Sequence, residues 1–143
     1  MAKMVDIQDK ESTAREAISE GFLLLGGPTL EAIRTGKTKK GDPLRTSEVA
    51  AIQAVKITPN LIPFCHPIPL TQVTVNFEML DDRVRCTCQV KARYKTGVEM
   101  ESLVGASVAL LTLWDMVKYL EKDENGQYPR TRIDGLRVIS KVK

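Results

Sequence analysis

Hydrophobic and polar residues alternate along two neighbouring segments, 73–79 and 84–92. A period of two places every second side chain on one face of a β-strand, so both segments are predicted strands. Asp81 and Asp82 separate them and are typical turn residues, which predicts an antiparallel hairpin. A further alternating segment, 131–142, predicts a last strand near the C-terminus.

The pattern of residues 13–24 fits two structures. Thr13 followed by Glu16 matches a capping box, which favours a helix. Across the same residues, small side chains alternate with larger ones, which favours a strand with one small-residue face. Ser19 and Gly21 weaken a helix, and a small face suits close packing, so we expect a strand.

Three other segments carry helical signals. The first covers residues 29–35 and ends at a glycine, a common residue just after a helix. In the second, Asp42 and Pro43 provide an N-cap and a first helical residue, which predicts a helix that continues to Lys56. The third covers residues 101–122 and is mostly apolar. In the second helix, we expect four side chains to point inward: Leu44, Val49, Ile52 and Val55.

Between the second helix and the hairpin, residues 57–69 contain four prolines, and we expect no regular element there. The mixture of helices with an antiparallel hairpin predicts an α+β fold, in which helices pack on one face of a sheet. No linker or repeat divides the chain, and 143 residues suit one core. We therefore expect a single domain over residues 1–143.

The composition is that of an ordinary globular protein. Hydrophobic residues make up 43% of the chain and charged residues 27%, which argues against global disorder. The N-terminus lacks the apolar stretch of a signal peptide. Ser107, Thr112 and Asp115 interrupt the longest apolar run, so we expect no membrane span. The three cysteines should be free thiols, and the expected compartment is the cytoplasm.

The third helix carries charged residues on an otherwise apolar segment. Such residues must be paired, solvated or used for chemistry. Asp115 and Lys118 are three residues apart, so they share a helix face and can touch. Glu101 and Asp115 also lie on nearly one face, but they are 14 positions apart, which separates them by about 21 Å along the helix. If both serve one small substrate, a second subunit must supply one of them. Small residues would let either a second subunit or the protein's own sheet approach this helix closely: Gly105, Ala106, Ser107 and Ala109.

His66 is the only histidine and lies in the proline-rich segment. Proton transfer by an imidazole would have to use it, although a lone histidine is often only a structural hydrogen-bonding residue. A metal site is a further interpretation, in which Cys65 and His66 join Cys86 and Cys88. This spacing lacks the Cys-x-x-Cys knuckle that is typical of zinc. The last two cysteines share one face of a predicted strand, as small core residues would.

An RNA-binding module is the alternative from another functional class, because a sheet with helices on one face and a formal charge of +3 also fit it. Such modules stack bases on exposed strand aromatics. Aromatic residues are only 5% of this chain, and the hairpin offers Phe77 and Tyr94 without the glycine- and aromatic-rich RNA-binding motif. We therefore expect no nucleic-acid partner.

Four motifs occur in order along the chain, and the Cys-His-Pro and Gly-Val-Glu-Met-Glu parts of them are specific: Lys40-Gly-Asp, Leu61-Ile-Pro-Phe-Cys-His-Pro67, Lys95-Thr-Gly-Val-Glu-Met-Glu101 and Asp115-Met-Val-Lys118. With them, and with Thr13-x-Arg15 and Arg137-Val-Ile-Ser-Lys141, the chain resembles the molybdenum cofactor biosynthesis protein C family, the cyclic pyranopterin monophosphate synthases. The resemblance covers nearly the whole chain. Some members continue with a Gly- and Lys-rich tail, whereas this chain stops at Lys143, so we expect any role of that tail to be absent or served otherwise.

The resemblance implies a ferredoxin-like α+β fold and a homohexamer, built as a trimer of dimers with active sites shared between subunits. It also implies the reaction. A cyclised dihydroguanosine triphosphate, a nucleotide-derived small molecule, would become cyclic pyranopterin monophosphate with loss of pyrophosphate. The family implies no resident cofactor or metal, and Mg²⁺ would act only as a companion of the pyrophosphate.

The family motifs also imply roles for individual residues. Asp115 and Lys118 would be the catalytic acid/base pair. Lysines suit the triphosphate, because an ammonium is a point charge that can follow a moving phosphate. The implied substrate-binding residues, with Arg15 the weakest of them, are Arg15, Lys40, Lys56, Cys65, His66, Pro67, Glu99, Met100, Glu101 and Lys141.

Overall fold

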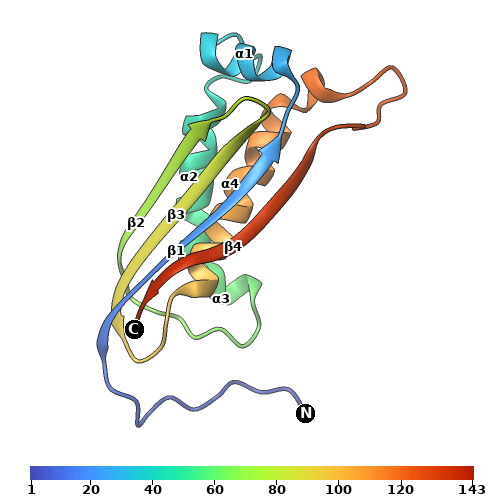
Figure 1. Ribbon diagram of the computed structural model, residues 1–143. Coiled ribbons are helices and arrows are strands. Elements are labelled where there is room, and N and C mark those ends of the chain that lie inside the picture. Colours follow the sequence, from blue (N-terminus) through green and yellow to red (C-terminus); the bar gives the residue numbers. More distant parts are fainter.

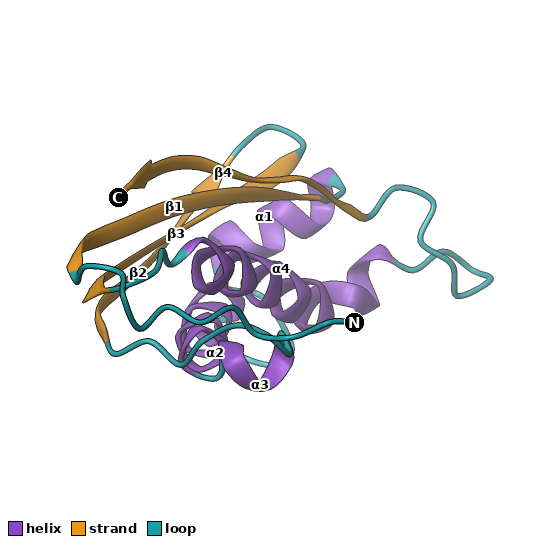
Figure 2. Ribbon diagram, turned by 90° about the horizontal axis from the view of Figure 1, so that it is seen from below, coloured by secondary structure: helices purple, strands orange, loops and turns teal.

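The structure is a computed structural model that describes residues 1–143, and one face of its four-stranded antiparallel sheet is covered by helices (Figure 2). In chain order the elements are β1 (Thr13–Leu24), α1 (Gly27–Thr35), α2 (Pro43–Lys56), α3 (Thr58–Leu61), β2 (Leu70–Met79), β3 (Arg83–Tyr94), α4 (Glu99–Glu121) and β4 (Arg132–Val142). The strands lie side by side in the order β2-β3-β1-β4 (Figure 1). This is the ferredoxin-like arrangement, so the predicted α+β class is confirmed.

β1 resolves the ambiguity of residues 13–24 in favour of a strand, which pairs with β3 on one side and β4 on the other. Small side chains on β1 let α4 come close to the sheet. The Ser19 hydroxyl donates a hydrogen bond to the Ser102 carbonyl of α4 at 2.7 Å. At Gly21, an added Cβ would lie only 2.7 Å from Leu110 Cδ1 of α4. The capping box is not formed, and the buried Thr13 hydroxyl has no hydrogen-bond partner.

α2 begins where its cap signal predicts. The Asp42 carboxylate accepts hydrogen bonds from the N–H groups of Leu44 and Arg45, both at 3.1 Å. The expectation that Val49 points inward was wrong, because it lies on the outer face of the helix and is 45% exposed. Ala51 occupies the inward face instead, fully buried against the core.

The proline-rich segment contains one regular element that we did not predict. Residues 58–61 form the short helix α3, with Pro59 in its first turn, where the missing N–H needs no partner. The buried Thr58 hydroxyl donates to the Val55 carbonyl at 2.9 Å and so joins α3 to α2. The remaining residues, 62–69, form a loop that leads to the edge strand β2.

α4 is long and apolar enough, by length and composition alone, to cross a membrane. In this fold, however, it packs against β1 and β3 on one side and against α2 on another, as a core helix does. At Gly105, an added Cβ would lie 2.5 Å from Cys88 Sγ and 2.7 Å from Val55 Cγ2. Gly105 therefore lets the protein's own sheet and α2 approach α4 closely.

The predicted hairpin is confirmed, with β2 and β3 paired in antiparallel register and both strand cysteines in the core. The last strand, β4, is less regular than its sequence pattern suggests. Its register against β1 shifts twice, and Gly135 has a φ of 62°, which favours glycine. Near the C-terminus the expected alternation fails, because Ser140 and Val142, which it places on one inward face, are both exposed.

The direction of α4 separates the two ends of the molecule. Its N-terminal end lies beside α3, at the end where both chain termini are found (Figure 1). Its C-terminal end lies beside α1, at the opposite end. Residues at the two ends of this one helix therefore contribute to different surfaces.

Candidate functional site

Most candidate residues form two groups at opposite ends of α4. At the C-terminal end, the Asp115 cluster consists of Lys40, Asp115 and Lys118, which are linked by ion pairs. At 1.5 Å per helical residue, Glu101 lies about 21 Å along the axis from Asp115. At the N-terminal end of α4, the Glu101 cluster consists of Cys65, His66, Glu99, Met100 and Glu101, which line one cavity.

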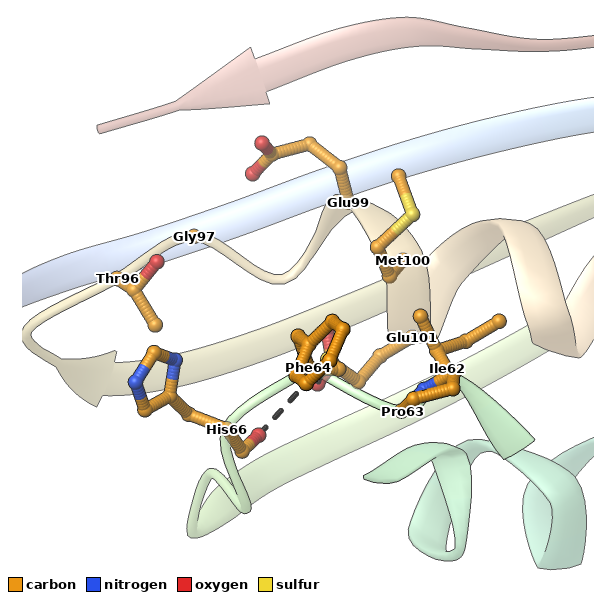
Figure 3. Close-up of a pocket in the computed structure, with 10 residues that line it drawn as sticks. Ile62, Pro63, Phe64, His66, Thr96, Gly97, Glu99, Met100 and Glu101 are labelled. Carbon is orange, nitrogen blue, oxygen red and sulfur yellow. Dashed lines mark hydrogen bonds between the residues drawn. The ribbon is translucent and has the colours of Figure 1, made fainter. Parts of the chain in front are cut away.

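The Glu101 cluster surrounds a cavity of about 370 Å³ between the proline-rich loop and the start of α4. Figure 3 shows His66 on the loop side with its ring near Thr96, whereas Glu99 and Met100 project from the first turn of α4. Phe64 also lines this cavity. The volume lies in the range of small-molecule pockets, which is roughly 300–1,000 Å³.

Glu101 is a buried carboxyl with one free oxygen. It is 2% exposed, and only Oε2 has a partner, the Cys65 thiol, which donates to it at 3.5 Å. Oε1 has no hydrogen-bond partner. Burial raises the pKa of Glu101. Burial, together with the Glu101 carboxylate, raises the pKa of Cys65 to about 11, so the thiol keeps its proton and remains the donor. An incompletely paired carboxyl beside a cavity is a functional candidate.

His66 contacts the N-terminal segment of the chain. Its Nε2 lies 2.8 Å from the Val5 carbonyl oxygen. A carbonyl can only accept, so Nε2 carries a proton and donates in this contact. The Lys95 ammonium donates to the Gln8 carbonyl at 3.1 Å, which ties the same segment to the end of β3. No pattern in the sequence predicts these long-range contacts.

Glu99 links the Glu101 cluster to β4. Its carboxylate lies 3.3 Å from the ammonium of Lys141, near the C-terminal end of that strand. In Figure 3 the Glu99 side chain points away from Phe64 and toward the strands. Its other oxygen, Oε1, is buried without a partner. A lysine expected to bind substrate therefore reaches this cluster from the far end of the sequence.

The Asp115 cluster is open to solvent. The Asp115 carboxylate lies 3.0 Å from Lys118 Nζ and 3.5 Å from Lys40 Nζ. Lys118, and to a lesser degree Lys40, hold the pKa of Asp115 below its usual range. In return, the Asp115 carboxylate raises the pKa of Lys118. The expected contact between Asp115 and Lys118 is confirmed, and the fold adds Lys40 from the loop between α1 and α2.

Lys56 and Pro67 line a second cavity of about 370 Å³, and Glu101 also lies on its wall. Glu101 therefore stands between two cavities. Arg15 is placed differently. It is 7% exposed, and its guanidinium donates to the backbone carbonyls of Tyr94 and Lys95, both at 3.2 Å. These bonds tie β1 to the end of β3 and occupy two of its donors.

The structure does not assemble the cysteine–histidine metal site. No three His, Cys, Asp or Glu side chains come together in a group that could hold a metal ion. Cys86 and Cys88 lie in the core between the sheet and the helices, and burial raises the pKa of each thiol to about 12. A buried, protonated thiol is a small apolar residue rather than a ligand.

Two residues next to the clusters escaped the sequence analysis. Phe64 is 49% exposed and lines the Glu101 cavity. Its position as an aromatic residue in a stiff proline-rich loop could have identified it from the sequence. Tyr119 follows Asp115 by four residues, so helix geometry alone places it on the same face. Its hydroxyl accepts a hydrogen bond from the backbone N–H of Lys39 at 2.8 Å.

A sequence model of the MoaC family matches residues 4–143. A protein of Thermococcus kodakarensis is 57% identical over 141 residues, which cover 99% of this chain and 90% of that protein. One from Methanoregula boonei is 56% identical over 142 residues, with coverages of 99% and 92%. One from Sulfurisphaera tokodaii is 53% identical over 142 residues, with coverages of 99% and 94%. Each of the three relatives is named "Probable cyclic pyranopterin monophosphate synthase".

Proposed function

The chain belongs to the MoaC family, and on this premise we propose that it is a cyclic pyranopterin monophosphate synthase of molybdenum cofactor biosynthesis. Its substrate is a cyclised dihydroguanosine triphosphate, and its products are cyclic pyranopterin monophosphate and pyrophosphate. The enzyme is therefore a pyrophosphate-releasing lyase. Relatives with this name match nearly the whole chain, so an RNA- or metal-binding module is not favoured.

The observation that carries the proposal is the position of the two clusters on α4. Each cluster has groups suited to part of such a substrate, yet about 21 Å of helix separates Glu101 from Asp115. A two-fold dimer places the same surface on both partners, so it can bring the Glu101 cluster of one subunit to the Asp115 cluster of the other. We propose that three such dimers form a hexamer and that each active site is shared.

The charges of the clusters suit different parts of the reaction. Lys40, Lys56 and Lys141 supply ammonium groups for the triphosphate. Asp115 and Lys118 form an ionised acid/base pair that can exchange protons with the substrate. In the cavity of the Glu101 cluster, the buried carboxyl and the His66 ring offer hydrogen bonds to the heteroatoms of the forming pterin.

We propose that the enzyme needs no resident cofactor or metal and that any Mg²⁺ present accompanies the pyrophosphate. A cytoplasmic location suits a nucleotide-derived substrate. Elemental analysis of protein purified without added metal should find well under one zinc ion per chain. Stoichiometric zinc that resists chelation would contradict this part of the proposal.

The direct test is to incubate the purified protein with the cyclised dihydroguanosine triphosphate and to assay pyrophosphate and pterin together. Both products should form in equal amounts. Filter binding to single-stranded RNA, at low and moderate salt, tests the other functional class. RNA binding that survives moderate salt, without turnover of the nucleotide, would refute the synthase.

Subunit mixing tests the shared site. Chains with Lys118→Ala and chains with Glu101→Gln are each expected to be inactive, because each loses one cluster. After dissociation and reassembly at equal amounts, half of the dimers are mixed and each contains one intact site, so about a quarter of wild-type activity should return. Lys40→Ala mixed with Lys118→Ala is the matched control, because both changes fall in the same cluster and should show no recovery. No recovery in the first mixture, despite verified exchange, would refute the shared site.

A further inference from the structure

The loop that carries Lys40 is attached to α4 through Tyr119. The backbone N–H of Lys39 donates a hydrogen bond to the Tyr119 hydroxyl at 2.8 Å. The Lys39 ammonium also lies over the Tyr119 ring, 4.9 Å from its centroid. These contacts span 80 residues of sequence and hold the residue immediately before Lys40.

The other contacts of Lys40 and its loop are few: the Lys40 ammonium lies 3.4 Å from the Asp115 carbonyl oxygen, and the Thr38 hydroxyl donates a hydrogen bond to the Gly41 carbonyl. Two glycines with positive φ, Gly36 at 71° and Gly41 at 104°, lie on either side of it in the loop. Its ion pair with Asp115 is 3.5 Å long, and its side chain is 48% exposed. Exposed ion pairs of this kind are weak, because water screens them and they must order a long side chain. Apart from these exposed contacts of the Lys40 ammonium, the contacts with Tyr119 are what attach the loop to α4.

The helical register of α4 connects this anchor to the catalytic pair. Tyr119 lies four residues after Asp115, so the two side chains are neighbours on one face of α4. Two successive loop residues therefore contact two side chains that lie one helical turn apart on that face: Lys39 contacts Tyr119, and Lys40 contacts Asp115. Lys118, on the same turn, completes the cluster.

We propose that Tyr119 is a positioning residue of the synthase reaction: its hydroxyl fixes the loop of residues 36–41 so that the Lys40 ammonium stands beside Asp115. This role rests on the proposed function, in which Lys40 binds the triphosphate and Asp115 acts in proton transfer. The hydroxyl itself touches only the loop backbone, so Tyr119 acts through Lys40.

The test is Tyr119→Phe, which keeps the ring under Lys39 and removes only the hydroxyl. Tyr94→Phe is the matched control, since the Tyr94 hydroxyl makes no hydrogen bond in the structure and Tyr94 lies at the end of β3, near the other end of α4. Hydrogen–deuterium exchange of the peptide that covers residues 36–41 should become several-fold faster in Tyr119→Phe and stay unchanged in the control. This readout requires no substrate, so it separates a failure of the anchor from a failure of the proposed function.

Kinetics then test whether the anchor acts through Lys40. Loss of one hydrogen bond corresponds to a drop in kcat/KM of about three- to tenfold for Tyr119→Phe. In the Lys40→Ala background, whose residual turnover is followed at enzyme concentrations high enough to measure it, the same change should cost nothing further, because the group that it positions is already gone. Unchanged exchange, wild-type kcat/KM, or a full multiplicative loss in the double variant would each refute the positioning role.

Discussion

Replacing Glu101 by glutamine should make the protein more stable and inactive at the same time. The substitution keeps the shape of the side chain and the partner of Oε2 but removes the charge. In the native protein this carboxyl is 2% exposed, and its Oε1 has no partner. An unsatisfied buried polar group costs about 1–3 kcal/mol, and more when it is charged. Glutamine still leaves that position unpaired, so only the cost of the charge is removed.

The gain should depend on pH in a defined direction. Burial raises the pKa of Glu101 in the folded protein above its usual value near 4.5. The folded state therefore holds this proton more tightly than the unfolded state. That stabilisation is complete below the ordinary carboxyl pKa and is lost as the pH rises through the raised value. Glutamine cannot ionise, so its advantage over glutamate should be small at pH 4.5 and largest at pH 8.

The size of the effect follows from the length of the chain. With about 2.1 cal/mol/K per residue, unfolding 143 residues has an entropy of about 0.3 kcal/mol/K. Each kcal/mol that the removal of the charge contributes then corresponds to about 3 °C in Tm at pH 8. Activity should fall by about a hundredfold, because the charged hydrogen-bond partner of the forming pterin is lost, and a hydrogen bond to a charged group contributes up to about 3 kcal/mol.

Differential scanning calorimetry at pH 4.5 and pH 8, with equal subunit concentrations, measures the difference. Glu124→Gln is the control, because Glu124 lies exposed in the turn after α4 and should show no such pH-dependent gain. Equal shifts at both pH values, or a lower Tm for Glu101→Gln at pH 8, would refute the reasoning. The latter outcome would mean that a cation from another subunit neutralises this carboxylate in the assembly.

Asp115→Ala and Lys118→Ala should each fold normally, because the Asp115 side chain is exposed and that of Lys118 is about half exposed. Each variant should nevertheless lose product formation by about a hundredfold or more, and near-wild-type turnover in either would contradict their assignment. The buried Glu20 carboxylate accepts hydrogen bonds from Arg85 and Arg137. Burial alone would raise the pKa of Glu20, but the two guanidinium groups hold that pKa below its usual range. This stabilisation exists above the ordinary carboxyl pKa and disappears as the pH falls through the lowered value, so Glu20→Gln should cost about 1.5–3 kcal/mol in urea unfolding at pH 7 and less near pH 3. Gly105→Ala should cost about 1–3 kcal/mol, since its Cβ would lie 2.5 Å from a core sulfur, whereas Gly27→Ala meets nothing within 4 Å and should be near neutral by the same measurement.

Local patterns determined most of the elements. The Asp42 cap, the alternation on both sides of Asp81 and Asp82, and the long apolar segment each depend on residues within a few positions of one another. Such signals can be obtained from the sequence because the forces behind them are local. These signals gave the wrong result where tertiary packing decides which face of a helix is buried. Val49 is the example, because its apolar side chain lies on the outer face of α2.

The spacing of charges on one helix also determined part of the candidate site. A helix has a constant rise per residue, so the contact of Asp115 with Lys118, and the distance of both from Glu101, follow from residue numbers alone. The family motifs added which residues to examine. They did not say which of these residues meet within one chain.

Only the tertiary structure determines which of these residues are in contact. Lys40 reaches Asp115 across 75 residues of sequence, and His66 reaches the Val5 carbonyl across 61. The same holds for the anchor of the Lys40 loop on Tyr119, which joins residues 80 apart. Such contacts depend on how loops cross between the ends of packed elements. The course of these loops is determined by how the whole core packs, and no short stretch of sequence encodes that packing.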